Sequence, residues 1–114
     1  GVGSSRIPEI LDPSVLDDVV HVTEEETVLE CRRLLRDDAL FVGGSSGTVV
    51  AAIRRYFSSR PSRAPAHPVV ATIFPDRGER YLATIFDDGW VAARYPRLSA
   101  GDAIAASYAE GRPA

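Results

Sequence analysis

The first helical pattern in the chain begins at a strong start signal. Thr23 and Glu26 stand three residues apart, as in a capping box, where each side chain accepts a hydrogen bond from the other residue's backbone N–H. The glutamates at 24–26 also suit the positive end of a helix dipole. This pattern predicts a helix over residues 23–37. Its apolar positions, spaced by three or four residues, are Val28, Cys31, Leu34 and Leu35.

A second helix is predicted over residues 46–58. It follows the Gly43-Gly44 break, and Ser45 or Ser46 can supply its N-terminal cap. Its first two turns, residues 48–53, are apolar or small on every side, which is typical of a helix packed all round. The face predicted to be buried consists of Val49, Ala52, Ile53 and Tyr56.

Two short apolar runs predict strands. Residues 17–22 form the first, and residues 69–74 form the second, whose β-branched composition is typical of a strand buried on both faces. Residues 76–97 are predicted to be irregular, and Asp102 to cap a last short helix ending near residue 109. The order of elements predicts an α/β fold. Because two strands are too few for a stable sheet, we expect a fragment rather than an autonomous fold.

The composition narrows the class of protein. All 13 basic residues are arginine, and a net charge of −3 gives no basic footprint for nucleic acid. The single cysteine, Cys31, lies on the predicted apolar helix face, so we expect a buried small hydrophobe rather than a nucleophile.

No apolar run approaches the roughly 18–20 residues of a membrane span, and we expect a cytoplasmic protein that binds no membrane. The chain lacks methionine and opens abruptly on a Gly/Ser loop, which favours an internal cut.

Candidate chemistry gathers at residues 43–47, which read Gly-Gly-Ser-Ser-Gly before the second predicted helix. Glycines let a backbone approach a ligand closely, and a helix N-terminus favours negative charge or an acceptor atom. The alternative is a tight turn with an ordinary serine cap. The histidines, His21 and His67, suggest solvent-exposed or strand-edge roles, and we expect no metal site.

Three separated motifs resemble one enzyme family. The Gly-Gly-Ser-Ser-Gly turn, the element Pro-Asp-Arg-Gly-Glu-Arg-Tyr-Leu at residues 75–82 and the opening Gly-Val-Gly-Ser resemble the fold-type II pyridoxal-phosphate enzymes of the cysteine synthase and cystathionine β-synthase family. The resemblance implies the C-terminal portion of the large cofactor-binding domain. It divides the chain into a substrate-side loop (1–16), a strand-helix-turn-helix unit (17–60), a strand with the second motif (68–82) and a C-terminal tail (83–114).

The resemblance also implies roles for individual residues. Ser45 would hydrogen-bond the pyridine nitrogen of pyridoxal 5'-phosphate, and Ser46 and Thr48 would cap the helix instead. Glu79 and Arg80 would brace the structure. Arg6 would bind a substrate phosphate or carboxylate, or else be a surface arginine. The remaining cofactor-side residues are Gly43, Gly44, Pro75 and Asp76, and the remaining substrate-side residues are Gly1, Val2, Gly3 and Ser4.

Details of the motifs resemble one branch of the family, the 2,3-diaminopropionate-pathway synthases of siderophore and antibiotic biosynthesis. Such enzymes take O-phospho-L-serine, eliminate phosphate to an aminoacrylate and add the amine of L-glutamate, which gives N-(1-amino-1-carboxy-2-ethyl)glutamate. They are usually homodimers. Their Schiff-base lysine has no counterpart here, so the chain alone is expected to be inactive and to need the remainder of the enzyme. The alternatives are a cysteine synthase or O-phosphoserine sulfhydrylase, and a non-catalytic stand-alone binding module.

Overall fold

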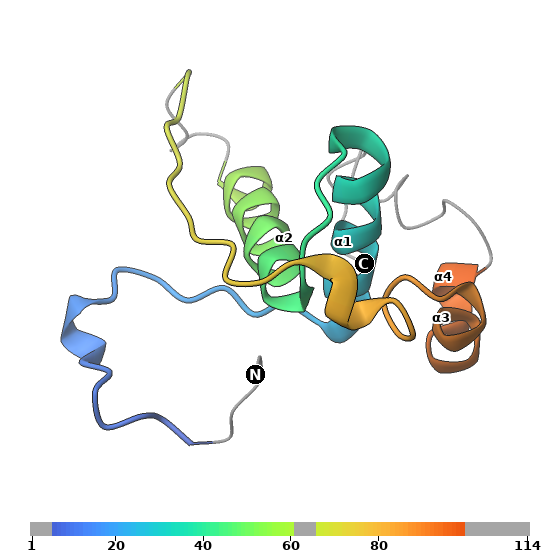
Figure 1. The fold of residues 1–114 in the computed structure, drawn as a ribbon. Coiled ribbons are helices and arrows are strands. Elements are labelled where there is room, and N and C mark those ends of the chain that lie inside the picture. The colour runs from blue at the N-terminus through green and yellow to red at the C-terminus, as the bar shows by residue number, and fades with distance from the viewer. Residues whose placement is uncertain (1–5, 61–65, 100–114) are drawn as a thin grey trace.

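A computed structural model describes residues 6–60 and 66–99 (Figure 1). The elements in chain order are the 3-10 turn η1 (Pro13–Val15), the helices α1 (Glu24–Asp38) and α2 (Gly44–Ser59), the 3-10 turn η2 (Gly78–Tyr81), and the short helices α3 (Asp88–Arg94) and α4 (Pro96–Ser99). The helix predicted after Asp102 lies outside the described residues.

The start of α1 confirms the predicted capping box. The Glu26 N–H donates to Thr23 Oγ1 over 3.2 Å, and the Thr23 N–H donates to Glu26 Oε2 over 2.7 Å. The predicted bounds, 23–37, agree with the observed helix to within one residue. The helix ends at Ala39, whose left-handed φ of 55° turns the chain toward the next helix.

The predicted serine cap of α2 is wrong. The N-cap is Gly43, which makes no side-chain cap hydrogen bond, and Ser45 and Ser46 already lie within the first turn. Thr48 does not cap the helix either. Its hydroxyl lies 2.8 Å from the Thr27 hydroxyl of α1 and donates to the Gly44 carbonyl over 3.1 Å. Thr48 therefore links the two long helices instead of closing the end of one.

The two long helices cross closely at Gly47. A methyl group built there would stand 2.3 Å from Cys31 Sγ and 2.8 Å from the Thr27 carbonyl oxygen, distances that no real contact allows. Cys31 is fully buried at this crossing, as predicted, and Sγ lies 3.5 Å from the Gly43 carbonyl oxygen. The glycine thus permits the approach of α1 and α2.

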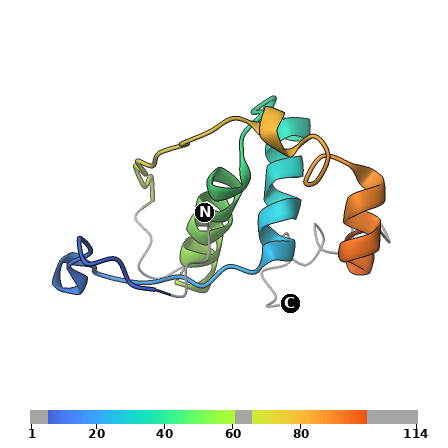
Figure 2. The same cartoon turned by 60° about the horizontal axis from the view of Figure 1, so that its bottom comes forward.

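Helix α1 lies between α2 and the α3–α4 pair (Figure 2). Residues 76–97 were predicted to be irregular, but Asp87 caps α3 by accepting from the Trp90 N–H over 2.6 Å. Tyr95 anchors the pair, because its hydroxyl donates to Glu24 Oε2 at the start of α1 over 2.8 Å. The resulting core consists of Val28, Cys31, Ile85, Val91 and Tyr95.

The predicted strands are absent from the described part of the chain. Residues 17–22 and 69–74 are extended, but the one β contact in residues 6–60 and 66–99 is an isolated antiparallel bridge between Val42 and Arg77. The described segment is therefore helical, and the two predicted strands are wrong for it. The physical reason is that neither run has a partner strand here, and Val69 is 100% exposed.

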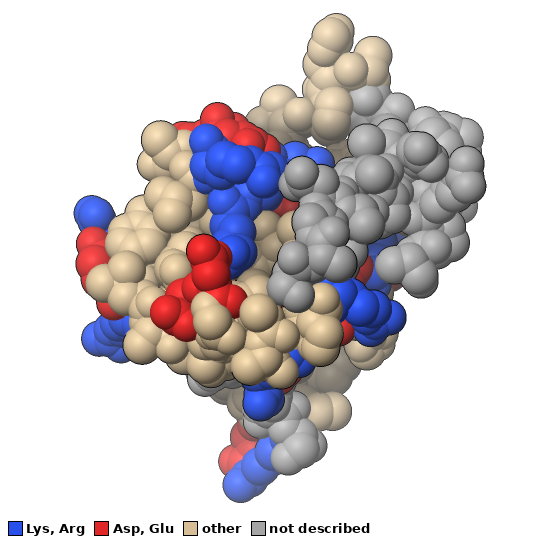
Figure 3. Space-filling model, turned by 90° about the vertical axis from the view of Figure 1, so that its right-hand side faces the viewer, with Lys and Arg blue, Asp and Glu red and all other residues tan. Residues whose placement is uncertain are grey.

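Acidic and basic side chains pair across the helices. Glu30 is buried and accepts from Arg33 over 2.7 Å and from Arg54 over 3.0 Å, and Arg55 pairs with Glu26. Arg32 donates to the Ile85 carbonyl over 2.8 Å and to Asp88 over 2.6 Å. The face that carries α3 and α4 shows arginine beside acidic side chains (Figure 3). Several arginines thus link elements that are distant in the sequence.

No described helix has both the length and the apolar character needed to cross a lipid bilayer.

Candidate functional site

The Gly-Gly-Ser-Ser-Gly turn is held by the second predicted motif. The Gly43 N–H donates to the Asp76 carbonyl over 3.1 Å, and the Gly78 N–H donates to the Phe41 carbonyl over 3.2 Å. A methyl group at Gly78 would stand 2.3 Å from the Phe41 ring, so the two segments touch directly. The fold therefore brings together two motifs that are far apart in the sequence, residues 43–47 and 75–82.

Asp76 packs against the turn with its side chain as well as its backbone. A methyl group built on Gly43 would stand 1.9 Å from Asp76 Oδ1, so this oxygen occupies the space beside the glycine. The other oxygen, Oδ2, accepts from the Tyr81 hydroxyl over 2.8 Å. Oδ1 is buried and accepts no hydrogen bond from the described residues.

The two serines of the turn have different environments. Ser46 is fully buried, and its hydroxyl oxygen has no hydrogen-bond partner among the described residues. Ser45 is half-buried and retains access to solvent. Both stand in the first turn of α2, where the N-terminal backbone N–H groups give the helix end positive character. Ser45 is therefore the serine that can meet a ligand at this helix end.

Electrostatics around the turn keep Tyr81 protonated. The hydrogen bond to the Asp76 carboxylate raises the pKa of Tyr81, partial burial adds to the effect, and the backbone N–H of Gly44 opposes it. Burial raises the pKa of Cys31 to about 11, on the α1 side of the turn. Neither group ionises near neutral pH, and the Asp76 side chain lies directly against Gly43.

Other predicted residues lie elsewhere. Pro75 is exposed beside Asp76, and Arg6 is paired with Glu9 over 3.2 Å on the N-terminal arm that extends away from the helices (Figure 1). Gly1, Val2, Gly3 and Ser4 lie outside the described residues. Glu79 pairs with Arg77 over 2.9 Å, and the bracing role of Glu79 and Arg80 stays a prediction.

The histidines and potential metal ligands form no site in the part of the chain described. His21 and His67 have exposed side chains, and the His21 carbonyl accepts from Arg55. Across residues 6–60 and 66–99, no group of histidine, cysteine, aspartate or glutamate side chains could hold a metal ion.

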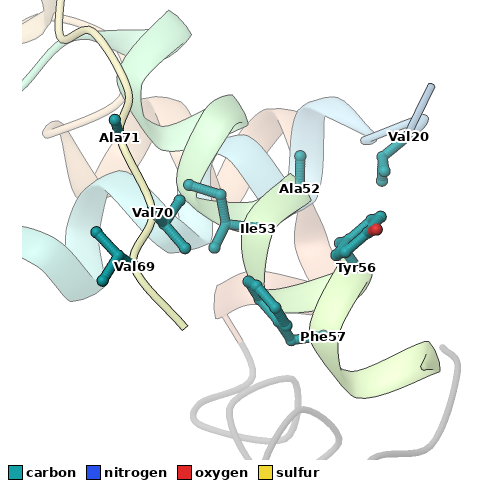
Figure 4. A pocket seen from close by; sticks show the side chains of 8 residues that line it. All are labelled: Val20, Ala52, Ile53, Tyr56, Phe57, Val69, Val70 and Ala71. Atoms are coloured by element: carbon teal, nitrogen blue, oxygen red, sulfur yellow. The ribbon is translucent and has the colours of Figure 1, made fainter. Parts of the chain in front are cut away.

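An apolar groove of about 380 Å³ opens on the side of α2 that faces away from α1 (Figure 4). Ile53 of α2 lies beside Val70 of the extended run, and Tyr56 lies near Val20. The prediction that α2 is packed all round is therefore wrong for this structure. The lining is Val20, Ala52, Ile53, Tyr56, Phe57, Val69, Val70 and Ala71.

Sequence reasoning missed the contact of Tyr81 with the glycine turn. Tyr81 stands five residues after Asp76, and the intervening 3-10 turn η2 folds its ring back over the carboxylate. The available signal was the Gly-Glu-Arg-Tyr sequence, in which Gly78 permits the close approach that starts this turn.

Comparison with known proteins relates the chain to amino-acid synthases. No family model matches the chain. It is 45% identical over 109 residues to a protein of Ralstonia nicotianae, an alignment that covers 94% of this chain and 30% of that protein. It is 47% identical over 93 residues to a protein of Cupriavidus metallidurans, covering 81% of this chain and 27% of that protein.

Both relatives are named N-(2-amino-2-carboxyethyl)-L-glutamate synthase. The relationship predicted from the motifs is thereby confirmed, and the chain is a relative of these synthases. It spans about 30% of the length of the curated relatives that it matches. The name describes the same connectivity as the product expected from the motifs, a 2-amino-2-carboxyethyl group on the nitrogen of glutamate.

Proposed function

We propose that this chain is the C-terminal portion of the large cofactor-binding domain of a pyridoxal-phosphate-dependent N-(2-amino-2-carboxyethyl)-L-glutamate synthase. One observation carries the proposal: a glycine turn at the N-terminus of α2, held by Asp76, presents Ser45 while Ser46 is buried. The identity of 45–47% to proteins with that name supports the same reaction.

The residues at the turn suit the ring side of pyridoxal 5'-phosphate. The Ser45 hydroxyl can donate to a pyridine nitrogen, and the absent side chains of Gly43 and Gly44 leave room for Asp76 and Tyr81 to pack against the turn that presents it. The chain contains no lysine, so the covalent attachment must come from elsewhere in the enzyme. Ser45, Gly43, Gly44 and Asp76 would therefore hold one edge of the cofactor.

When bound, the cofactor supplies an electron sink for carbanion chemistry. Ser45 sets how strong that sink is, because a neutral hydroxyl does not stabilise a protonated ring nitrogen as a carboxylate would. Asp76 is kept from that role, since its Oδ1 lies against Gly43 and its Oδ2 accepts from Tyr81. Ser45 thus favours β-elimination over the side reactions of a fully protonated ring.

The proposed substrates are O-phospho-L-serine and L-glutamate. The bond from the serine β-carbon to the phosphate oxygen breaks, and a bond from that carbon to the glutamate nitrogen forms, with release of inorganic phosphate. Arg6 is a proposed ligand for a substrate phosphate or carboxylate, because its guanidinium can pair with two oxygens at once. The residues that select the nucleophile are proposed to lie mainly outside this chain.

The remainder of the enzyme is proposed to complete the fold. The extended runs 17–22 and 69–74 would join a sheet, and the groove beside α2 would be filled, which gives the α/β architecture that this segment lacks alone. The whole enzyme is proposed to be a cytoplasmic homodimer that binds neither nucleic acid nor membranes.

The test uses the full-length gene product that carries this sequence. The protein is incubated with pyridoxal phosphate, O-phospho-L-serine, and either L-glutamate or sulfide. The proposal predicts phosphate release and a product with the mass of N-(2-amino-2-carboxyethyl)-L-glutamate. A product with sulfide alone would assign a sulfhydrylase instead. Absence of cofactor binding would favour a non-catalytic module and contradict the proposal.

A further inference from the structure

We propose that Asp76 and Tyr81 form a positioning pair that fixes the Gly43–Ser45 turn, and through it the Ser45 hydroxyl. The fixed turn follows from the contacts of the described residues. Its consequence for pyridoxal phosphate rests on the proposed function.

The first contact runs through the backbone. The Gly43 N–H donates to the Asp76 carbonyl over 3.1 Å, so the start of α2 depends on where Asp76 lies. The Gly43 carbonyl in turn accepts from the N–H of Ser46 over 3.1 Å and of Gly47 over 3.3 Å. Any shift of Asp76 is therefore passed to the first helical hydrogen bonds.

The second contact runs through the Asp76 side chain. Oδ1 occupies the space that a methyl group on Gly43 would need, at 1.9 Å, while Oδ2 accepts from the Tyr81 hydroxyl over 2.8 Å. Without the hydroxyl of Tyr81, neither carboxylate oxygen would have a hydrogen-bond donor among the described residues. Burial without a donor is costly, so the carboxylate would rotate toward water and release Gly43.

The third contact is the Tyr81 ring itself. A methyl group at Gly43 would stand 2.8 Å from Tyr81 Cε2, and one at Gly44 would stand 3.8 Å from Cε1. The ring therefore covers both glycines on one side and leaves the turn no room to move toward η2. Asp76 and Tyr81 act together, one through hydrogen bonds and the other through contact.

The test removes only the hydroxyl, with Tyr81→Phe in the full-length gene product. The chain offers a matched control in Tyr95→Phe, because the Tyr95 hydroxyl also donates to a carboxylate oxygen, that of Glu24, over 2.8 Å. Tyr95 follows α3, which lies across α1 from α2 (Figure 2), and its hydroxyl bonds the first turn of α1 rather than the glycine turn. A third variant, Asp76→Asn, keeps a carbonyl oxygen that can accept from Tyr81.

Two readouts are measured for each variant. The first is amide hydrogen exchange of residues 43–47 without cofactor, and the second is the affinity for pyridoxal phosphate together with the absorption spectrum of the bound form. We expect Tyr81→Phe to speed exchange at these residues about threefold to tenfold and to weaken cofactor binding by a similar factor, as for loss of one hydrogen bond. Tyr95→Phe should change neither readout, and Asp76→Asn should retain slow exchange.

Each failure has its own signature. Exchange at residues 43–47 that is equal in Tyr81→Phe and the unmodified protein overturns the positioning pair, whatever the cofactor does. Faster exchange in both tyrosine variants also overturns it, because a general loss of stability then explains the effect. If exchange is faster in Tyr81→Phe alone and the protein binds no pyridoxal phosphate, the result supports the positioning pair and contradicts the proposed function.

Discussion

The two sides of α2 differ in how complete they are. On the side of α1, Gly47 allows close contact with Cys31, Thr48 bonds Thr27, and Arg54 reaches the buried Glu30. On the opposite side, the groove is lined by apolar side chains, and Val69 is 100% exposed. The face toward α1 is packed against other residues of this chain. The opposite face presents an exposed apolar surface of the kind that soluble proteins usually cover.

This difference separates local from distant causes of structure. The α1–α2 unit is specified by residues within about one third of the chain, and it carries the glycine turn at its end. The open face finds no covering segment among the described residues, and we propose that the rest of the enzyme covers it. The glycine turn of the candidate site lies on the α1–α2 unit, and Asp76 and Tyr81 reach it from η2 and the residues before it, so the site needs this long-range contact but no sheet.

The largest expected effect is on the reactivity of Cys31. Because burial raises its pKa from 9.0 to about 11, the thiolate fraction at pH 8 falls about a hundredfold, and the side chain is 0% exposed. Alkylation by iodoacetamide at pH 8, followed by mass spectrometry, should be at least about a hundredfold slower than in urea-unfolded protein. Similar rates in both states would show that the α1–α2 contact is open.

The same group predicts how stability depends on pH. A raised pKa in the folded state means that the full contribution of Cys31 is present below pH 9.0 and is lost as pH rises toward about 11. The midpoint of urea unfolding should therefore fall over that range.

The next effect tests the helix crossing. Gly47→Ala places a methyl group 2.3 Å from Cys31 Sγ, and overpacking of this kind costs about 2 kcal/mol in the free energy of unfolding. Gly44→Ala is the control in the same helix, since its methyl group would meet Ile85 at an ordinary 3.4 Å and should change stability by less than about 0.5 kcal/mol. Equal urea midpoints for the two variants would contradict the close crossing.

The smallest effect is expected on the open face. Val69→Ser should change the free energy of unfolding of the 114-residue chain by less than about 0.5 kcal/mol, because Val69 is 100% exposed. In the full-length gene product the same change should lower the free energy of unfolding by about 1.5 kcal/mol, because we propose that the rest of that protein covers this face. Equal costs in the two proteins, measured by urea unfolding, would remove the contrast between the two faces.

The sequence predicted those elements that depend on residues close together in the chain. The capping box at Thr23 and the spacing of Val28, Cys31 and Leu34 predicted α1, because both depend on residues a few positions apart. The N-cap at Gly43 could not be predicted from serine preference, since the contact with Asp76 fixes where α2 begins.

The two strand predictions were wrong because a strand depends on residues far away in the chain. Residues 69–74 have a strand-like composition, but a strand needs a partner, and the described residues supply none. For the site, the motifs predicted that residues 43–45 and Asp76 share a function, and the fold places Asp76 in contact with Gly43. The role of Tyr81 required the geometry of η2, which composition does not encode.

The most direct measurement of the central claim is the absorption spectrum of pyridoxal phosphate bound to the full-length gene product, compared between Ser45→Ala and Ser46→Ala. Ser45 is half-buried at the turn, and Ser46 is fully buried with no hydrogen-bond partner among the described residues. We predict that Ser45→Ala shifts the spectrum and slows phosphate release from O-phospho-L-serine, and that Ser46→Ala changes neither. An unchanged spectrum and rate in Ser45→Ala would contradict the claim that this turn holds the cofactor.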